Sequence, residues 1–131
     1  MHITRLEPGE VFVFGSNGSG AHGGGAARFA LDRFGAVWGQ SEGLQGRSYG
    51  IDTMSGLAVF GEQARRFLAF AAEHPELRFL VTEAGCGIAG YRPEQVAGFF
   101  AGAGENVALP ESFVAVLGEG SARDSRTKWR G

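Results

Sequence analysis

Glycine is concentrated in two short segments of this chain, and each segment follows an apolar run. Of the 131 residues, 23 are glycine, well above the average share of roughly 7%. Six of them fall within residues 15–25, directly after apolar residues 11–14, and three fall within residues 85–90, after an apolar run at 77–82. Because glycine lets the backbone turn sharply and approach a ligand closely, the clusters predict two binding loops at strand ends. We call residues 15–25 the first glycine loop and residues 85–91 the second.

The composition is that of one folded domain. Hydrophobic residues make up 44% of the chain and charged residues 20%, which is typical of globular proteins and excludes a disordered chain. The net charge of −2 gives no reason to expect nucleic-acid binding, which favours basic patches. The apolar runs are too short to span a membrane, and residues 1–5 lack the apolar core of a secretory signal. We therefore expect a cytoplasmic protein with no membrane partner.

Cysteine, histidine and lysine are too few for several kinds of site. The chain has one cysteine, Cys86, and three histidines without metal-ligand spacing, so an internal disulfide is excluded and we expect neither a metal site nor a cofactor. The one lysine, Lys128, lies near the end of the chain. A mechanism that requires a lysine amine in a central pocket is therefore disfavoured.

Apolar periodicity predicts strands and helices in alternation. Strands are expected at residues 11–14, 47–51, 77–82 and 107–117, the last interrupted by Pro110, and helices at 26–34, from Ser55 to Pro75 and from Pro93 onward. Residues 39–46 are predicted to be a loop, and Ser55 is predicted to cap the second helix. This alternation favours an α/β fold with a largely parallel sheet. We expect one domain over residues 1–117 and a polar tail over residues 118–131.

Both glycine loops are expected where ligands bind in such folds, beyond the carboxyl ends of strands. Each loop runs into a predicted helix, and a helix start presents unpaired N–H groups and partial positive charge, which attract phosphate oxygens. We expect two such loops, lying side by side, to bind a diphosphate between them. The alternative is that the glycines only make tight turns. Residues 18–23 spell G-x-G-x-x-G, but the acid that would bind the ribose is not evident, since only Glu42 and Asp52 lie at a plausible distance. A dinucleotide-binding domain would also need more strands than the sequence predicts. The absence of G-K-[ST] excludes a P-loop NTPase.

The two loops together resemble those of macrodomains. G-S-N at residues 15–17 followed by G-G-G-A-A at 23–27 is similar to the first ligand loop of that family, and G-C-G-I-A-G at 85–90 to its second, diphosphate-gripping loop. The resemblance extends over residues 11–117. It implies a three-layer α/β module with helices flanking a mostly parallel sheet, and it implies that ADP-ribose, a related nucleotide diphosphate or an ADP-ribosylated target is the partner. The residues implied in ligand binding are Gly15, Ser16, Asn17, His22, Gly23, Gly24, Gly25, Gly85, Cys86, Gly87, Ile88, Ala89, Gly90 and Tyr91.

The second loop is most similar to the macrodomain branch that removes ADP-ribose from DNA or from acidic side chains of proteins, whose loops begin Gly-Cys-Gly. That branch uses a lysine just after its next strand, where this chain has Met54, and an acid in the second loop, where it has Ala89. Lysine-dependent glycosyl transfer is therefore not expected. Hydrolysis of ADP-ribosyl linkages would need other groups.

The main candidates for catalysis are Asn17, Asp52 and Cys86, with Glu83 as an alternative base and His22 as the base for the cysteine. Asn17 would hold the distal ribose or orient a water, or would be only a turn residue. Asp52, at the end of the second strand, would be a general base, as would Glu83 at the end of the third, or either would cap a helix or pair with an arginine. Cys86 would be a nucleophile with His22 as its base, or a small side chain packed beside a strand.

Three further residues are expected to contact the ligand. Tyr91 and Phe14 are expected to stack on the adenine or to line the site of the distal ribose, and His22 is a candidate phosphate contact.

Two other functions remain as alternatives. The first alternative function is a cysteine- or carboxylate-dependent hydrolase of another nucleotide-like substrate. The second is a non-catalytic protein-interaction domain whose glycine loops bind nothing.

Overall fold

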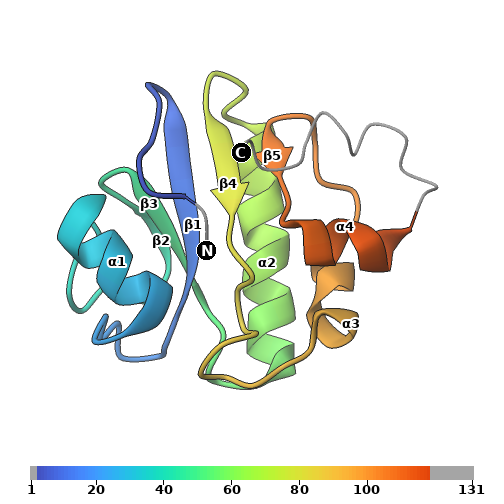
Figure 1. Cartoon of the computed structure of the whole chain (residues 1–131), viewed down its shortest axis with the longest axis horizontal. Coiled ribbons are helices and arrows are strands. Elements are labelled where there is room, and N and C mark those ends of the chain that lie inside the picture. Colours follow the sequence, from blue (N-terminus) through green and yellow to red (C-terminus); the bar gives the residue numbers. More distant parts are fainter. Residues whose placement is uncertain (1–2, 119–131) are drawn as a thin grey trace.

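The computed structural model describes residues 3–118, in which strands and helices alternate (Figure 1). The order is β1 (Glu10–Ser16), α1 (Gly25–Arg33), β2 (Gly43–Gln45), β3 (Ser48–Asp52), α2 (Leu57–Ala72), β4 (Arg78–Val81), α3 (Pro93–Val96), the 3-10 helix η1 (Ala97–Phe100), β5 (Val107–Ala108) and α4 (Glu111–Leu117). Over this part of the chain, no helix combines the length and the apolar character needed to cross a membrane.

The five strands form one sheet in the order β2-β3-β1-β4-β5. Strand β1 pairs in parallel with both β3 and β4, and β4 pairs in parallel with β5. Strand β2 is antiparallel to β3 and lies at one edge. The prediction of an α/β fold with a mostly parallel sheet is confirmed.

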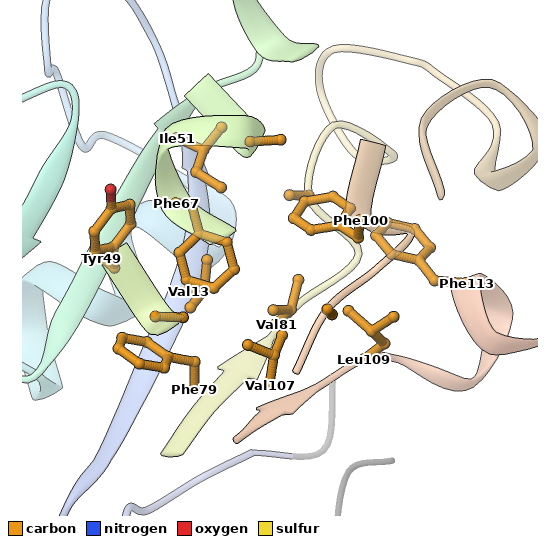
Figure 2. Packing of buried hydrophobic residues seen from close by; sticks show 14 of the residues in the cluster. Val13, Tyr49, Ile51, Phe67, Phe79, Val81, Phe100, Val107, Leu109 and Phe113 are labelled. Atoms are coloured by element: carbon orange, nitrogen blue, oxygen red, sulfur yellow. The ribbon is translucent and has the colours of Figure 1, made fainter. Parts of the chain in front are cut away.

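Helices cover both faces of the sheet, which explains why the central strand is an unbroken apolar run. Along β1, Val11 and Val13 belong to the core on the α2 face, whereas Phe12 and Phe14 belong to the core on the α1 face. All four side chains are buried. Figure 2 shows the larger core, in which Phe67 of α2 lies among side chains from β1, β3 and β4.

The chain reverses its direction across the sheet at β1. From β1 it passes through α1 to β3 on one side, and from β3 it passes through α2 to β4 on the other side of β1. The segment that leaves β1 leads to α1 on one face, and the segment that leaves β4 leads to α3, which packs in the α2 core on the other face. Such divergence opens a crevice at the carboxyl ends of the two strands, where open α/β sheets bind ligands. Both segments lie at the lower edge of the view in Figure 1.

The C-terminal part of the fold differs from the prediction. Residues 113–117, predicted to be a strand, belong to helix α4, which begins directly after Pro110. Phe113, Val114 and Leu117 face the core, and their spacing is helical. A short apolar run is compatible with either a strand or a helix. Here the side chains that pack against the core follow the spacing of a helix.

Three further predictions concern the loop at residues 39–46, the N-cap of α2 and the C-terminal tail. Residues 39–46, predicted to be a loop, contain the short strand β2. Gly56 rather than Ser55 is the N-cap of α2, because the Ser55 hydroxyl donates a hydrogen bond to the Asp52 carboxylate instead. The tail predicted for residues 118–131 lies outside the described residues except for Gly118.

Candidate functional site

A pocket of about 480 Å³ lies at the carboxyl ends of β1, β3 and β4. Its walls are residues 15–17, 21, 24–27, 53–54 and 82–89. Both glycine loops therefore contribute to one cavity, although they are far apart in the sequence. In particular, Asn17 and Cys86 line the same pocket.

The two loops approach each other closely at two places. A Cβ atom added to Gly15 would lie 3.4 Å from the nitrogen of Gly85 and 3.0 Å from the hydroxyl oxygen of Thr53. A Cβ atom added to Gly24 would lie 4.0 Å from the Cδ1 atom of Ile88. The end of β1 thus lies against the start of the second loop, with little room for a side chain at Gly15.

The side chain of Asn17 closes the first part of the first glycine loop. Its Nδ2 donates to the carbonyl of Ala21 at 2.9 Å, and its Oδ1 accepts from the N–H of Ala21 at 2.9 Å and from the hydroxyl of Ser19 at 3.1 Å. The N–H of Gly20 also donates to the Asn17 carbonyl at 3.0 Å. Because these bonds use the amide within the loop, we interpret Asn17 as a residue that shapes the pocket wall.

Both loops contribute residues to the pocket wall whose backbone N–H groups have no partner in the described part of the chain. Helix α1 starts at Gly25, and its N-cap, Gly24, makes no side-chain cap hydrogen bond. Within residues 3–118, the N–H groups of residues 25–27 have no hydrogen-bond acceptor, and the same holds for those of residues 87–89 in the second loop. Free N–H groups and a helix start favour anions, and both features occur among the residues of the pocket wall.

The side chains of the pocket add little positive charge or free donor capacity. Among the described residues, no arginine or lysine lines the pocket, and Glu83 is the one charged residue that does. The hydroxyls of Ser16, Thr53 and Thr82 already donate to backbone carbonyls. Attraction for an anion must therefore come from the backbone N–H groups.

His22, predicted to contact the ligand, lies in the core instead of the pocket wall. Its side chain is 0% exposed, and its ring meets Phe14 edge-on with ring centroids 5.1 Å apart. The Nε2 atom lies 3.1 Å from Oε1 of Gln45, whose own amide nitrogen donates to two backbone carbonyls. These two bonds fix the orientation of the Gln45 amide, so that its Oε1 faces the histidine as an acceptor. His22 therefore donates the hydrogen bond through Nε2. Phe14 is also fully buried, which removes it as a partner for adenine.

Asp52 stabilises the turn after β3 and does not border the pocket. Its carboxylate accepts hydrogen bonds from the N–H of Met54 at 2.9 Å and from the hydroxyl of Ser55 at 2.6 Å. Its own N–H donates to Oε1 of Gln63 at 2.8 Å. We interpret Asp52 as a positioning residue that holds Met54 in the pocket wall. The other predicted carboxylate, Glu83, does line the pocket.

Cys86 lines the pocket, but its surroundings disfavour the thiolate. Burial raises the pKa of its thiol, and the negative charges of Glu83 and Glu94 raise that pKa further. A nucleophilic cysteine needs a lowered pKa or an adjacent base, and the predicted base, His22, is in the core. The surroundings therefore favour a packing role for the thiol.

We expect Cys86 to react slowly with iodoacetamide. Because the thiolate is the reactive form, alkylation of the native protein near neutral pH should be about tenfold slower than that of the same cysteine in denatured protein. The rate should rise steeply as the pH approaches the raised pKa. Mass spectrometry of timed samples measures both rates. Native protein that reacts as fast as denatured protein would contradict this interpretation.

The remaining predicted residues lie beside the pocket. Gly23, Gly90 and Tyr91 do not border the cavity. The N–H of Tyr91 donates to the Gly85 carbonyl at 2.9 Å, which closes the second loop, and its ring packs near Phe60 with centroids 6.4 Å apart. Sequence reasoning missed several wall residues that lie within the first glycine loop, start the helix after it or follow a strand: Ala21, Ala26, Ala27, Thr53, Thr82 and Ala84.

Comparisons of the chain with protein-family models, with curated proteins and with solved structures find no match. Over residues 3–118, no group of three or more His, Cys, Asp or Glu residues is arranged to hold a metal ion.

Proposed function

We propose that this protein binds ADP-ribose or a related nucleotide diphosphate, with the diphosphate between the two glycine loops. The observation that carries the proposal is that residues 25–27 and 87–89, whose N–H groups have no acceptor within residues 3–118, line the same pocket. A diphosphate has charged oxygens on two adjacent phosphorus atoms, which suits donors from two loops that line one pocket. The pocket volume of about 480 Å³ lies in the range of small-molecule sites.

The proposal includes a macrodomain-like three-layer arrangement. Helices α1 and α2 on opposite faces of the sheet support it, as do the glycine loops that follow β1 and β4. With the diphosphate between the loops, the distal ribose would lie near residues 15–17 and 24–25, on the wall that Asn17 shapes.

Binding rather than hydrolysis is the function that the pocket supports. Cys86 lacks an activating base, Asp52 is engaged in its own turn, and Met54 occupies the expected lysine position. The amide of Asn17 is used within the loop. Binding through backbone donors requires none of these side chains to react.

Isothermal titration calorimetry with ADP-ribose tests the proposal. We expect saturable heat at one site per chain, together with a rise in the melting temperature of the protein. ADP should bind more weakly, because it lacks the distal ribose. No heat and no thermal shift at millimolar ADP-ribose would refute the proposal and favour a protein-interaction domain.

Asn17→Ala should weaken ADP-ribose binding by about 10- to 100-fold, which corresponds to about 1–3 kcal/mol for the loss of partly buried hydrogen bonds. The variant loses the bonds that close residues 17–21, so the first loop no longer holds its wall of the pocket. Titration calorimetry measures the change. Ser19→Ala is the matched control, because it removes only one exposed bond to Asn17. Equal affinities of Asn17→Ala and the wild type would contradict this role.

A further inference from the structure

Glu83 is the one charged residue among the described residues that line the pocket. It follows β4 in the sequence by two residues and is exposed. Its carboxylate accepts a hydrogen bond from the hydroxyl of Ser112 on α4 through Oε2. Within the described part of the chain, it makes no ion pair with an arginine or lysine.

A carboxylate in an anion site is unfavourable unless the ligand also carries hydrogen-bond donors. Near a bare diphosphate, Glu83 would repel like charge, because no arginine or lysine of residues 3–118 lines the pocket to neutralise it. A sugar next to the diphosphate removes this difficulty, since its hydroxyls donate to carboxylate oxygens in strong, charge-assisted bonds. An acidic side chain near a strand end binds ribose hydroxyls in the same way in dinucleotide-binding folds.

We propose that Glu83 binds hydroxyl groups of a ribose and so selects a ribose-bearing diphosphate over the bare diphosphate. This inference rests on the proposed function and adds a residue that sets specificity. The Ser112 hydroxyl holds one carboxylate oxygen in place, and the other oxygen would accept hydrogen bonds from the ribose. The pocket then recognises its ligand by two chemistries: backbone N–H groups bind the phosphates, and Glu83 binds the sugar.

Titration calorimetry of Glu83→Ala with two ligands, ADP-ribose and inorganic diphosphate, tests this inference. We expect ADP-ribose to bind about tenfold more weakly to the variant, because charge-assisted hydrogen bonds are lost. Inorganic diphosphate should bind equally well or more tightly, because a like charge is removed. Glu94→Ala is the matched control, since Glu94 is an exposed acid outside the pocket wall, and it should change neither affinity.

A second variant keeps the inference testable if Glu83→Ala is poorly folded. Ser112→Ala keeps the Glu83 carboxylate but removes the hydrogen bond that positions it. This variant should weaken ADP-ribose binding severalfold without weakening diphosphate binding. If the wild type binds ADP-ribose but both variants change the two affinities by the same factor, the role of Glu83 is overturned and the proposed function stands. If the wild type binds neither ligand, the proposed function itself fails.

Discussion

Replacing Gly85 by alanine should lower the free energy of unfolding by about 3–5 kcal/mol. Gly85 has a φ of 83°, a conformation that an L-residue adopts only with strain, and an added Cβ would lie 2.6 Å from Cε2 of Phe60. Phe60 is 0% exposed and packs against Phe99 and Phe100, so it has no free space to move into. Chemical denaturation followed by circular dichroism measures the loss.

Gly87→Ala is the matched control in the same loop. Gly87 has no positive φ, and an added Cβ would meet no atom within 4 Å, so its effect on unfolding should be less than about 0.5 kcal/mol. If Gly85→Ala is as stable as Gly87→Ala, the second loop is not held against the core as the structure indicates. ADP-ribose binding should also be lost in Gly85→Ala, because a displaced loop no longer presents the N–H groups of residues 87–89.

Gly20→Ala should lower the free energy of unfolding by about 3 kcal/mol. At this position the added methyl group would clash with backbone atoms rather than with a side chain. Gly20 has a φ of 71°, and an added Cβ would lie 2.4 Å from the carbonyl carbon of Gly39 and 2.6 Å from the nitrogen of Gln40. The N–H of Gly39 also donates to the Gly20 carbonyl at 2.8 Å. The two backbone segments must separate to admit a methyl group, which displaces the first glycine loop.

Gly23→Ala serves as the control for Gly20→Ala. Gly23 lies in the same loop, has no positive φ and has open space around its Cβ position, so alanine there should leave stability nearly unchanged. Thermal and chemical denaturation of both variants provide the comparison. Equal stability of the two variants would show that the loop does not pack on residues 39–40.

The central strands and the position of both loops could be predicted from sequence, because buried parallel strands are unbroken apolar runs. Residues 11–14 and 77–82 overlap β1 and β4, and the glycine clusters directly after them predict where the chain leaves the sheet. Helix α4 could not be predicted, because the apolar residues of 113–117 fit either periodicity. The packing of Phe113 against the η1 residue Phe100, with centroids 5.6 Å apart, is a tertiary contact that the local sequence does not encode.

The roles of single residues in the site were harder to predict than the site itself. Sequence shows that Asn17, His22 and Asp52 lie in or near loops, but not where their hydrogen bonds go. In the structure, the side chains of Asn17 and Asp52 close turns, and His22 is buried against Gln45. Likewise, sequence does not distinguish a glycine that must remain glycine, such as Gly85, from one that tolerates alanine. That difference depends on neighbours from distant parts of the chain.

The central claim is that both glycine loops bind one diphosphate, and an NMR titration with ADP-ribose tests it most directly. In ¹⁵N–¹H spectra, the amide signals of residues 25–27 and 87–89 should shift together and saturate along one binding curve. Signals from α4 residues outside the pocket, such as Val116, should stay in place. Saturating ADP-ribose that leaves either set of loop amides unmoved would contradict the claim.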